Sequence, residues 1–187
     1  EISDAIREDV LDSLPDHVVA DALRELDSDD LVDIVEDLEA ADQGRLLGAM
    51  LAADRVAVEQ ALAWPEHSAG RLMQRELVVA PEHWTVGEAI DFLRGAEHLP
   101  DQFYHVILVD PRMVPVGYVT LGRVLSSGRE VALKAITEDS FRTVAATDEE
   151  ADVAYIFNQY HLISCPVVDG SGRLVGVITI DDAMNVL

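Results

Sequence analysis

The sequence predicts an α+β protein, with an N-terminal all-α superhelical domain of short helices followed by two tandem α/β units with small sheets. Two observations predict this architecture. Leucines recur every 12 to 13 positions through the first third of the chain, at positions 14, 26, 38 and 51, which indicates short stacked helices. In the remainder, a helix start followed by two β-rich runs is written twice. The chain has 187 residues, of which 49 % are hydrophobic, so each part can bury a core.

Residues 1–64 are predicted to form the helical domain. Each leucine closes a pattern of apolar residues at i, i+3 and i+4, and acidic or serine residues open the next helix. Pro15 fits the first turn of the helix that ends near Leu26, and Ser28 fits the cap of the helix that ends near Leu38. Such short helices must stack to bury their apolar faces, so we expect a small superhelix.

The duplicated part is predicted to comprise a first repeat with its linker at 65–130 and a second repeat at 131–187. Thr85 and Thr147, each followed three residues later by glutamate, are expected to start a helix with a capping box. These threonines are 62 positions apart, whereas the strand residues are 59 apart, and the difference of three indicates a loop insertion. The residues that correspond between the two repeats at this offset of 59 are Asp110 and Asp169, Gly117 and Gly176, and Thr120 and Thr179. Met73 and Met184 are predicted to be core residues.

The net charge of −23 argues against nucleic acid and anionic membranes as partners and favours cations. The first 64 residues carry 18 acidic and four basic residues, against 18 and nine in the remainder. Asp29 and Asp33 are four apart on one predicted helix, where like charges cost about 0.2 to 0.5 kcal/mol unless a cation lies between them and a partner surface. Without further context, such a pair is more often a solvated helix face.

Other classes of site are not indicated. Cys165 is single and reads as a small buried hydrophobe in a reducing compartment. The histidines lack zinc-site spacing, and no nucleophile elbow, metal-hydrolase motif or phosphate loop occurs, so we expect no enzyme and no catalytic residues. Neither a signal peptide nor a membrane-length apolar run occurs, so the sequence is expected to be a soluble intracellular piece. It begins at Glu1 without an initiator methionine and stops just after a helical pattern, so we expect it to be cut from something longer.

The residues of the second repeat then carry a resemblance. Pro166-Val167-Val168-Asp169, followed by Gly176-Val177-Ile178-Thr179-Ile180-Asp181-Asp182, resembles a cystathionine-beta-synthase (CBS) domain. The linker Ser68-Ala69-Gly70-Arg71-Leu72-Met73, preceded by acidic helices, resembles the cytosolic part of MgtE-type magnesium transporters. The resemblance implies a homodimer formed through CBS domains, at the cytoplasmic face of the cell membrane and joined to a membrane channel domain of the same chain. It implies that Mg²⁺ bridges the helical domain to the CBS pair and closes the channel.

The resemblance also implies ligands. Asp29 and Asp33 match family carboxylates on the helical domain, and Asp182 matches one on the second CBS domain. Glu149 falls on an acidic position of the family, and Asp181 is a neighbour able to contribute, although helix starts favour acidic residues in any protein. His161 and Asn185 depart from the family's aspartates, so sites there are lost, moved or filled by neighbours such as Asp152. Replacing Asp29 and Asp33 is expected to weaken Mg²⁺-induced compaction more than replacing Glu1 and Asp4.

The alternative function is an adenine-nucleotide-sensing CBS module that binds ATP or AMP. In the wider CBS family, a threonine followed three residues later by aspartate holds a ribose. Thr179 and Asp182 keep this pair in the second repeat, whereas the first repeat has Thr120 with Arg123 in place of the aspartate. Nucleotide binding is compatible with Mg²⁺ sensing.

Overall fold

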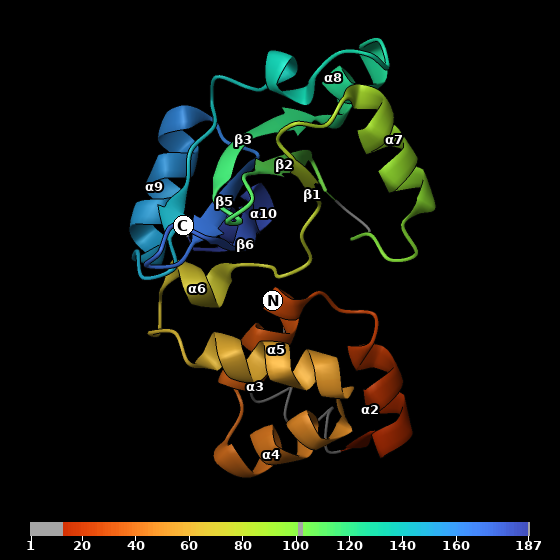
Figure 1. Ribbon diagram of the computed structural model, residues 1–187. Coiled ribbons are helices and arrows are strands. Elements are labelled where there is room, and N and C mark those ends of the chain that lie inside the picture. The colour runs from red at the N-terminus through yellow and green to blue at the C-terminus, as the bar shows by residue number, and fades with distance from the viewer. Residues whose placement is uncertain (1–12, 101–102, 187) are drawn as a thin grey trace. The chain divides into compact units, whose positions relative to one another are not determined.

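The computed structural model describes residues 13–100 and 103–186 and divides the chain into two compact units, Glu1–Glu66 and His67–Leu187 (Figure 1). Each unit is described by itself. The α+β fold class is confirmed, because the first unit is helical in its described part and the second combines helices with two small sheets. Within the described ranges, no helix has the length and apolar character needed to cross a bilayer.

The helical unit contains α2 (Asp16–Leu23), α3 (Ser28–Glu36), α4 (Ala40–Ala49) and α5 (Ala52–Leu62). Helix α3 packs against α4 and α5, and α2 packs against α4. Val32, Val35, Val58 and Ala61 are fully buried in this core, as the i, i+3 apolar pattern predicts. The predicted cap at Ser28 is wrong: Asp27 is the N-cap, and Ser28 is the first helical residue and is buried.

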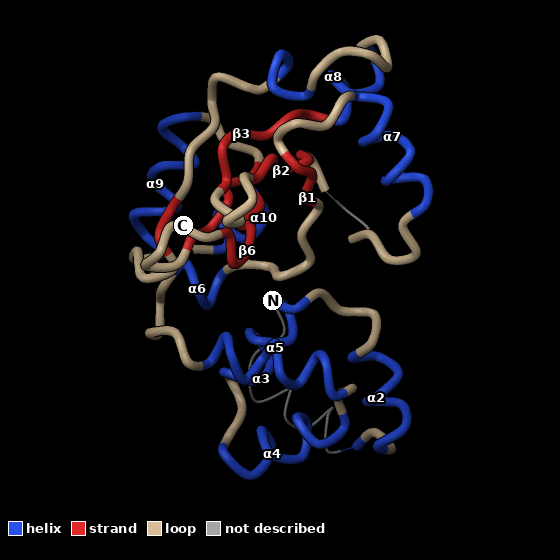
Figure 2. Tube along the Cα trace, in the orientation of Figure 1, coloured by secondary structure: helices blue, strands red, loops and turns tan. Residues whose placement is uncertain are grey.

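The second unit contains two sheets of three strands with the same topology (Figure 2). In each sheet a short first strand pairs in parallel with the central strand, which forms an antiparallel hairpin with the third. The first repeat comprises α6 (Ala69–Leu72), β1 (Val79–Pro81), α7 (Val86–Gly95), β2 (His105–Val109), β3 (Pro115–Thr120) and α8 (Leu121–Ser126). The second comprises η1 (Leu133–Ile136), β4 (Val144–Ala145), α9 (Glu150–Tyr160), β5 (Ser164–Val168), β6 (Leu174–Thr179) and α10 (Ile180–Asn185).

The strands lie in the middle of this unit, with α7 and α8 on one side and α9 on the other (Figure 1). The central strand β2 is buried along its whole length, and after His105 its residues form a continuous apolar run and not an alternating one. The hairpin predicted at residues 169–172 is confirmed: it joins β5 to β6, and Gly172 takes a φ of +78° there.

The two repeats exchange their leading segments. Ala69 N–H donates to the carbonyl of Asp148 at 2.8 Å, and Leu133 N–H donates to the carbonyl of Trp84 at 3.0 Å. Both donors and both acceptors are 64 positions apart (133 minus 69, 148 minus 84). The leading segment of the first repeat, which contains α6, is therefore hydrogen-bonded to the second repeat, and the leading segment of the second, which contains η1, is hydrogen-bonded to the first.

This offset of 64 corrects the sequence alignment of the helices. Thr85 caps α7 with the predicted capping box, but its structural equivalent is Glu149, the N-cap of α9, and not Thr147. The predicted capping box between Thr147 and Glu150 is wrong, because α9 begins two residues later than that alignment requires. The repeats thus differ by five residues between helix and strands (64 minus 59), and not by three.

Candidate functional site

The acidic residues proposed on the helical unit lie one turn apart on α3 but differ in environment. Asp29 is in the first turn, where the helix dipole favours a carboxylate, and its residue is only 8 % exposed. Asp33 is exposed on the following turn. Asp33 is therefore the carboxylate of this pair that is directly accessible to a cation from solvent.

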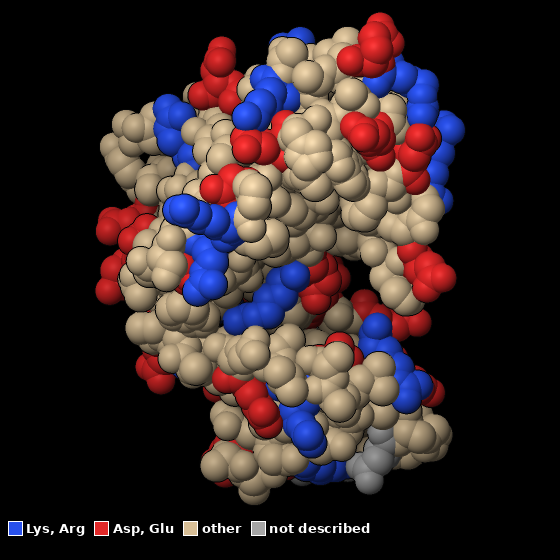
Figure 3. Space-filling model, in the orientation of Figure 1, with Lys and Arg blue, Asp and Glu red and all other residues tan. Residues whose placement is uncertain are grey.

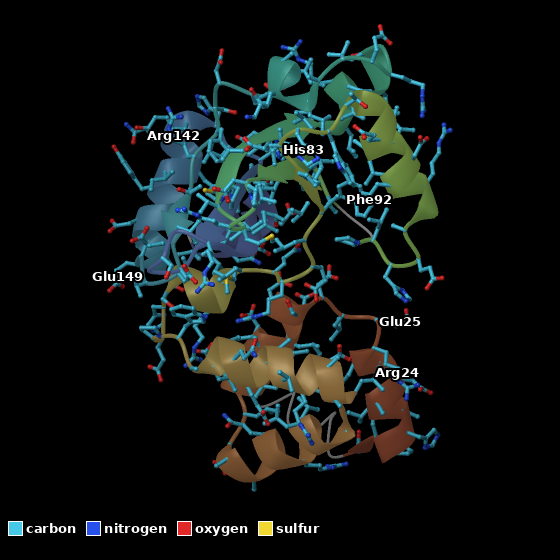
Figure 4. All side chains as sticks on the ribbon, in the orientation of Figure 1. Arg24, Glu25, His83, Phe92, Arg142 and Glu149 are labelled. Carbon is cyan, nitrogen blue, oxygen red and sulfur yellow. The ribbon has the colours of Figure 1, made fainter. Side chains whose placement is uncertain are left out.

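The acidic residues proposed on the second repeat lie at the starts of its two helices. Glu149 is the exposed N-cap of α9, and its backbone pairs with that of Ser68. Figure 4 shows Glu149 and Arg142 near opposite ends of α9. Asp181 is exposed in the first turn of α10, and Asp182 beside it is half-buried.

The two positions that depart from the family lie at helix ends. His161 is the exposed C-cap of α9 in the left-handed conformation, with a φ of 52°, and Asn185 is the last residue of α10. Carboxylate oxygens suit Mg²⁺, whereas an imidazole nitrogen does not and an amide oxygen adds no charge. Figure 3 shows aspartate and glutamate side chains spread over the face in view, where their oxygens are accessible from solvent. Among the described residues, no group of three or more His, Cys, Asp or Glu converges to hold a metal ion.

A small cavity that is partly open to solvent lies between the two repeats, and its enclosed volume of about 20 Å³ has room for about one water molecule. Its wall is formed by the leading segment of the first repeat, the residues that enter β2, the start of β5 and the end of β6. The lining residues are Gln74, Glu76, Val78, Phe103, Tyr104, His105, Ile107, Ser164, Val177 and Thr179.

His105 and Ser164 join the repeats in the wall of this cavity. The imidazole Nδ1 and the hydroxyl oxygen are 2.6 Å apart, and the two residues are first in the equivalent central strands β2 and β5, separated by 59 positions. Burial lowers the pKa of His105 to about 4, so the imidazole is neutral at pH 7. The sequence interpretation missed this pair, although the offset of 59 places the two residues at matching positions.

Thr179 and Asp182, the predicted ribose pair, are in contact at the edge of the cavity. The Thr179 hydroxyl donates to Asp182 Oδ2 at 2.6 Å, and the Thr179 backbone N–H donates to the same oxygen at 2.9 Å. This arrangement caps α10. In the first repeat, the Thr120 hydroxyl accepts from the backbone N–H of Arg123, whose side chain lies 3.7 Å from Glu138. Of the two repeats, the second therefore pairs a threonine hydroxyl with a carboxylate, and a carboxylate there can accept hydrogen bonds from a ribose diol.

Two family models match consecutive parts of the chain. The MgtE intracellular N domain matches residues 1–67, and the CBS domain matches residues 69–130 and 133–187. The magnesium transporter MgtE of Thermus thermophilus is 30 % identical over 162 residues, covering 85 % of this chain and 36 % of the transporter. The magnesium transporter MgtE of Bacillus subtilis is 25 % identical over 166 residues, covering 89 % and 37 %. The chain thus spans little more than a third of these relatives.

Solved structures agree in fold. A crystal structure of the cytosolic domain of the Mg²⁺ channel MgtE in complex with ATP matches with a TM-score of 0.92 and 29 % identity, covering 100 % of this chain and 77 % of that one. The soluble part of a magnesium transporter matches with a TM-score of 0.87 and 24 % identity, covering 96 % and 70 %. At that lower identity the second match supports the fold alone.

Proposed function

The chain belongs to the MgtE family, with an MgtE intracellular N domain ahead of two CBS domains, and we propose that it is the magnesium-sensing regulatory region of a transporter or channel of that family. The observation that carries this proposal is the succession of the two family models over the chain. The proposed mechanism is docking of the helical unit onto the CBS pair through Mg²⁺ bridges, which closes the membrane domain when Mg²⁺ is plentiful.

The acidic surface supplies the physical basis for such a switch. With a net charge of −23, contact between two acidic surfaces is repulsive until cations lie between them. Mg²⁺ prefers six oxygen ligands and keeps several waters, so one or two carboxylates from each surface suffice. Asp33 on α3 and Asp181 at the start of α10 are exposed carboxylates of this kind. Asp29, Asp182 and Glu149 complete the proposed set.

Small-angle scattering against Mg²⁺ from zero to about 20 mM, with KCl matched for ionic strength, tests this proposal. We expect the radius of gyration to fall with Mg²⁺ alone, and an identical response to potassium would contradict specific bridging. Because Glu1 and Asp4 lie outside the described residues, the matched control for Asp29→Asn/Asp33→Asn is Asp42→Asn/Asp54→Asn. Both double variants remove two charges from the helical unit, so only a specific site predicts a larger loss of compaction in the first.

A second candidate function, adenine-nucleotide binding, is favoured by the cavity between the CBS domains. Thr179 lines the cavity, and Asp182 is hydrogen-bonded to that threonine. The relative crystallised with ATP adds support. Isothermal titration calorimetry with ATP and AMP tests this function. Thr179→Val should abolish binding, whereas Thr120→Val, at the equivalent helix cap of the first CBS domain, should not; equal effects would contradict the assignment.

We further propose that the CBS pair dimerises at the cytoplasmic face of the membrane. Large apolar side chains are exposed on the helices of both CBS domains: Leu125 on α8 is 73 % exposed, and Tyr155 on α9 is 62 % exposed. Met184 on α10, predicted to be a core residue, is 43 % exposed and is the equivalent of Leu125. Sedimentation of the chain with Leu125→Glu/Met184→Glu should show monomers, and an unchanged dimer would place the interface elsewhere.

A further inference from the structure

The cavity that Thr179 lines, the open cavity, has a pseudo-symmetric counterpart in the first CBS domain. The residues of that counterpart follow from the offsets of 64 for the leading segments and 59 for the strands. Gln74 N–H donates to the carbonyl of Val177 at 2.8 Å, and Glu138 N–H donates to that of Tyr118 at 3.0 Å. These equivalent bonds show that residues of the leading segments correspond at an offset of 64 and residues of the strands at 59. The counterpart pairs are Gln74 and Glu138, Glu76 and Ser140, Val177 and Tyr118, Thr179 and Thr120, and Asp182 and Arg123.

The counterpart position is filled by a side chain of the chain itself. Tyr118 replaces the smaller Val177, and its residue is only 1 % exposed. Its hydroxyl lies 2.9 Å from the hydroxyl of Ser140, the residue that replaces Glu76. Its ring packs edge-on against Phe141, with 5.4 Å between centroids, and lies 4.0 Å from the ring of His105. The phenol therefore has both an apolar enclosure and a hydrogen-bond partner, which is the arrangement that a buried tyrosine needs.

Charged residues also differ between the open cavity and its counterpart. Arg123 stands where the open cavity has Asp182, and its guanidinium Nε lies 3.7 Å from Glu138 Oε1. An ion pair thus joins Arg123 to Glu138. At the open cavity their equivalents are Asp182, which lies beside the cavity, and Gln74, which lines it. Burial also raises the pKa of Tyr118, so its hydroxyl stays protonated and keeps the hydrogen bond with Ser140.

We propose that the Tyr118 ring occupies the counterpart of the open cavity as an internal plug, so that the chain binds one adenine nucleotide per CBS pair, at Thr179. This inference rests on the second candidate function, nucleotide binding. The duplicated fold supplies two equivalent positions, and the exchange of valine for tyrosine at one of them leaves a single open site. Removing the ring and restoring the residues of the open cavity should create a second site of the same class.

Calorimetric stoichiometry with AMP tests the plug. The wild-type chain should bind one AMP, and Tyr118→Phe, which keeps the ring, should also bind one. The variant Tyr118→Val/Arg123→Asp/Glu138→Gln, which copies Val177, Asp182 and Gln74, should bind two. Adding Thr120→Val to that variant should return the stoichiometry to one, because the new site would lose its ribose hydroxyl partner.

Each outcome separates the plug from nucleotide binding itself. A wild-type stoichiometry of zero would reject the nucleotide function and the plug with it. A wild-type stoichiometry of two, or one site abolished by Thr120→Val and not by Thr179→Val, would overturn the plug alone. A triple variant that keeps the wild-type circular dichroism and binds one AMP would also overturn it. If the triple variant does not fold, the wild-type stoichiometry and the two threonine variants still decide the question.

Discussion

Replacing Gly176 by alanine should loosen the segment that leads from the helical unit into the CBS pair. A Cβ atom at Gly176 would lie 2.8 Å from the backbone oxygen of Gln74 and would also clash with the Met73 side chain. Gln74 and Val177 exchange two backbone hydrogen bonds, of 2.8 and 3.0 Å. Relief of the clash requires either strain, at about 1 to 3 kcal/mol, or loss of these bonds, each worth about 0.5 to 1.5 kcal/mol. The expected destabilisation is therefore about 1 to 6 kcal/mol, depending on how much of each occurs.

Urea denaturation of the chain measures this free energy, with Gly170→Ala as the control. Gly170 lies in the β5–β6 turn, where an added Cβ meets nothing within 4 Å, so its replacement should change the stability by less than about 0.5 kcal/mol. Gly117, the equivalent glycine of the first CBS domain, faces only the Thr137 side chain, at 3.0 Å, and should give an intermediate loss. Equal stabilities for Gly176→Ala and Gly170→Ala would refute the close packing of residues 73 and 74 on β6.

Three further predictions concern single side chains. Thr85→Ala should cost about 0.5 to 2 kcal/mol in urea denaturation because it removes a capping box, whereas Thr147→Ala should cost almost nothing; the reverse order would restore the alignment of the two threonines. Because the pKa of His105 is about 4 in the folded chain, below its ordinary 6.5, stability should fall as the pH drops from about 6.5 toward 4. The free energy of unfolding should fall by about 2 kcal/mol over this range, once solvent screening is allowed for. A His105→Gln variant that loses as much stability over the same pH range would show that another group is responsible. Burial raises the pKa of Cys165 to about 12, so a thiol reagent at pH 8 should label it only after unfolding, and rapid native labelling would contradict its burial.

Much of the fold follows from sequence patterns that report local structure. The i, i+3 spacing of apolar residues in the first third predicts helices, and their burial confirms it. The turn at residues 169–172 predicts the β5–β6 hairpin, because glycine tolerates the positive φ that this turn needs. The offset of 59 for the strands also holds, since residues in matched strands keep their register with the sheet.

The errors arise where several patterns compete or where contacts are distant in sequence. Thr147 has the residues of a capping box, yet α9 begins at Glu150 because the Glu150 N–H bonds to the carbonyl of His67, in a segment 83 positions away. Met184 has an apolar side chain of the kind found in cores, but it lies on the exposed face of a six-residue helix. The cavity was not predicted because its wall combines residues 74–78, 103–107, 164 and 177–179, which only the exchanged segments bring together.

Neighbouring positions 117 and 118 explain why a duplicated fold need not give duplicated sites. Glycine is favoured at 117 and at its equivalent 176, because in each case the exchanged leading segment approaches within 3.0 Å of the place where a Cβ would stand. This constraint comes from the path of the exchanged segments, so both repeats must satisfy it. The next residue has no such constraint: valine at 177 leaves space beside Thr179, and tyrosine at 118 is accommodated with its hydroxyl bonded to Ser140. The exchanged segments thus fix the symmetry of the pair, and the side chains that follow each glycine are free to break it.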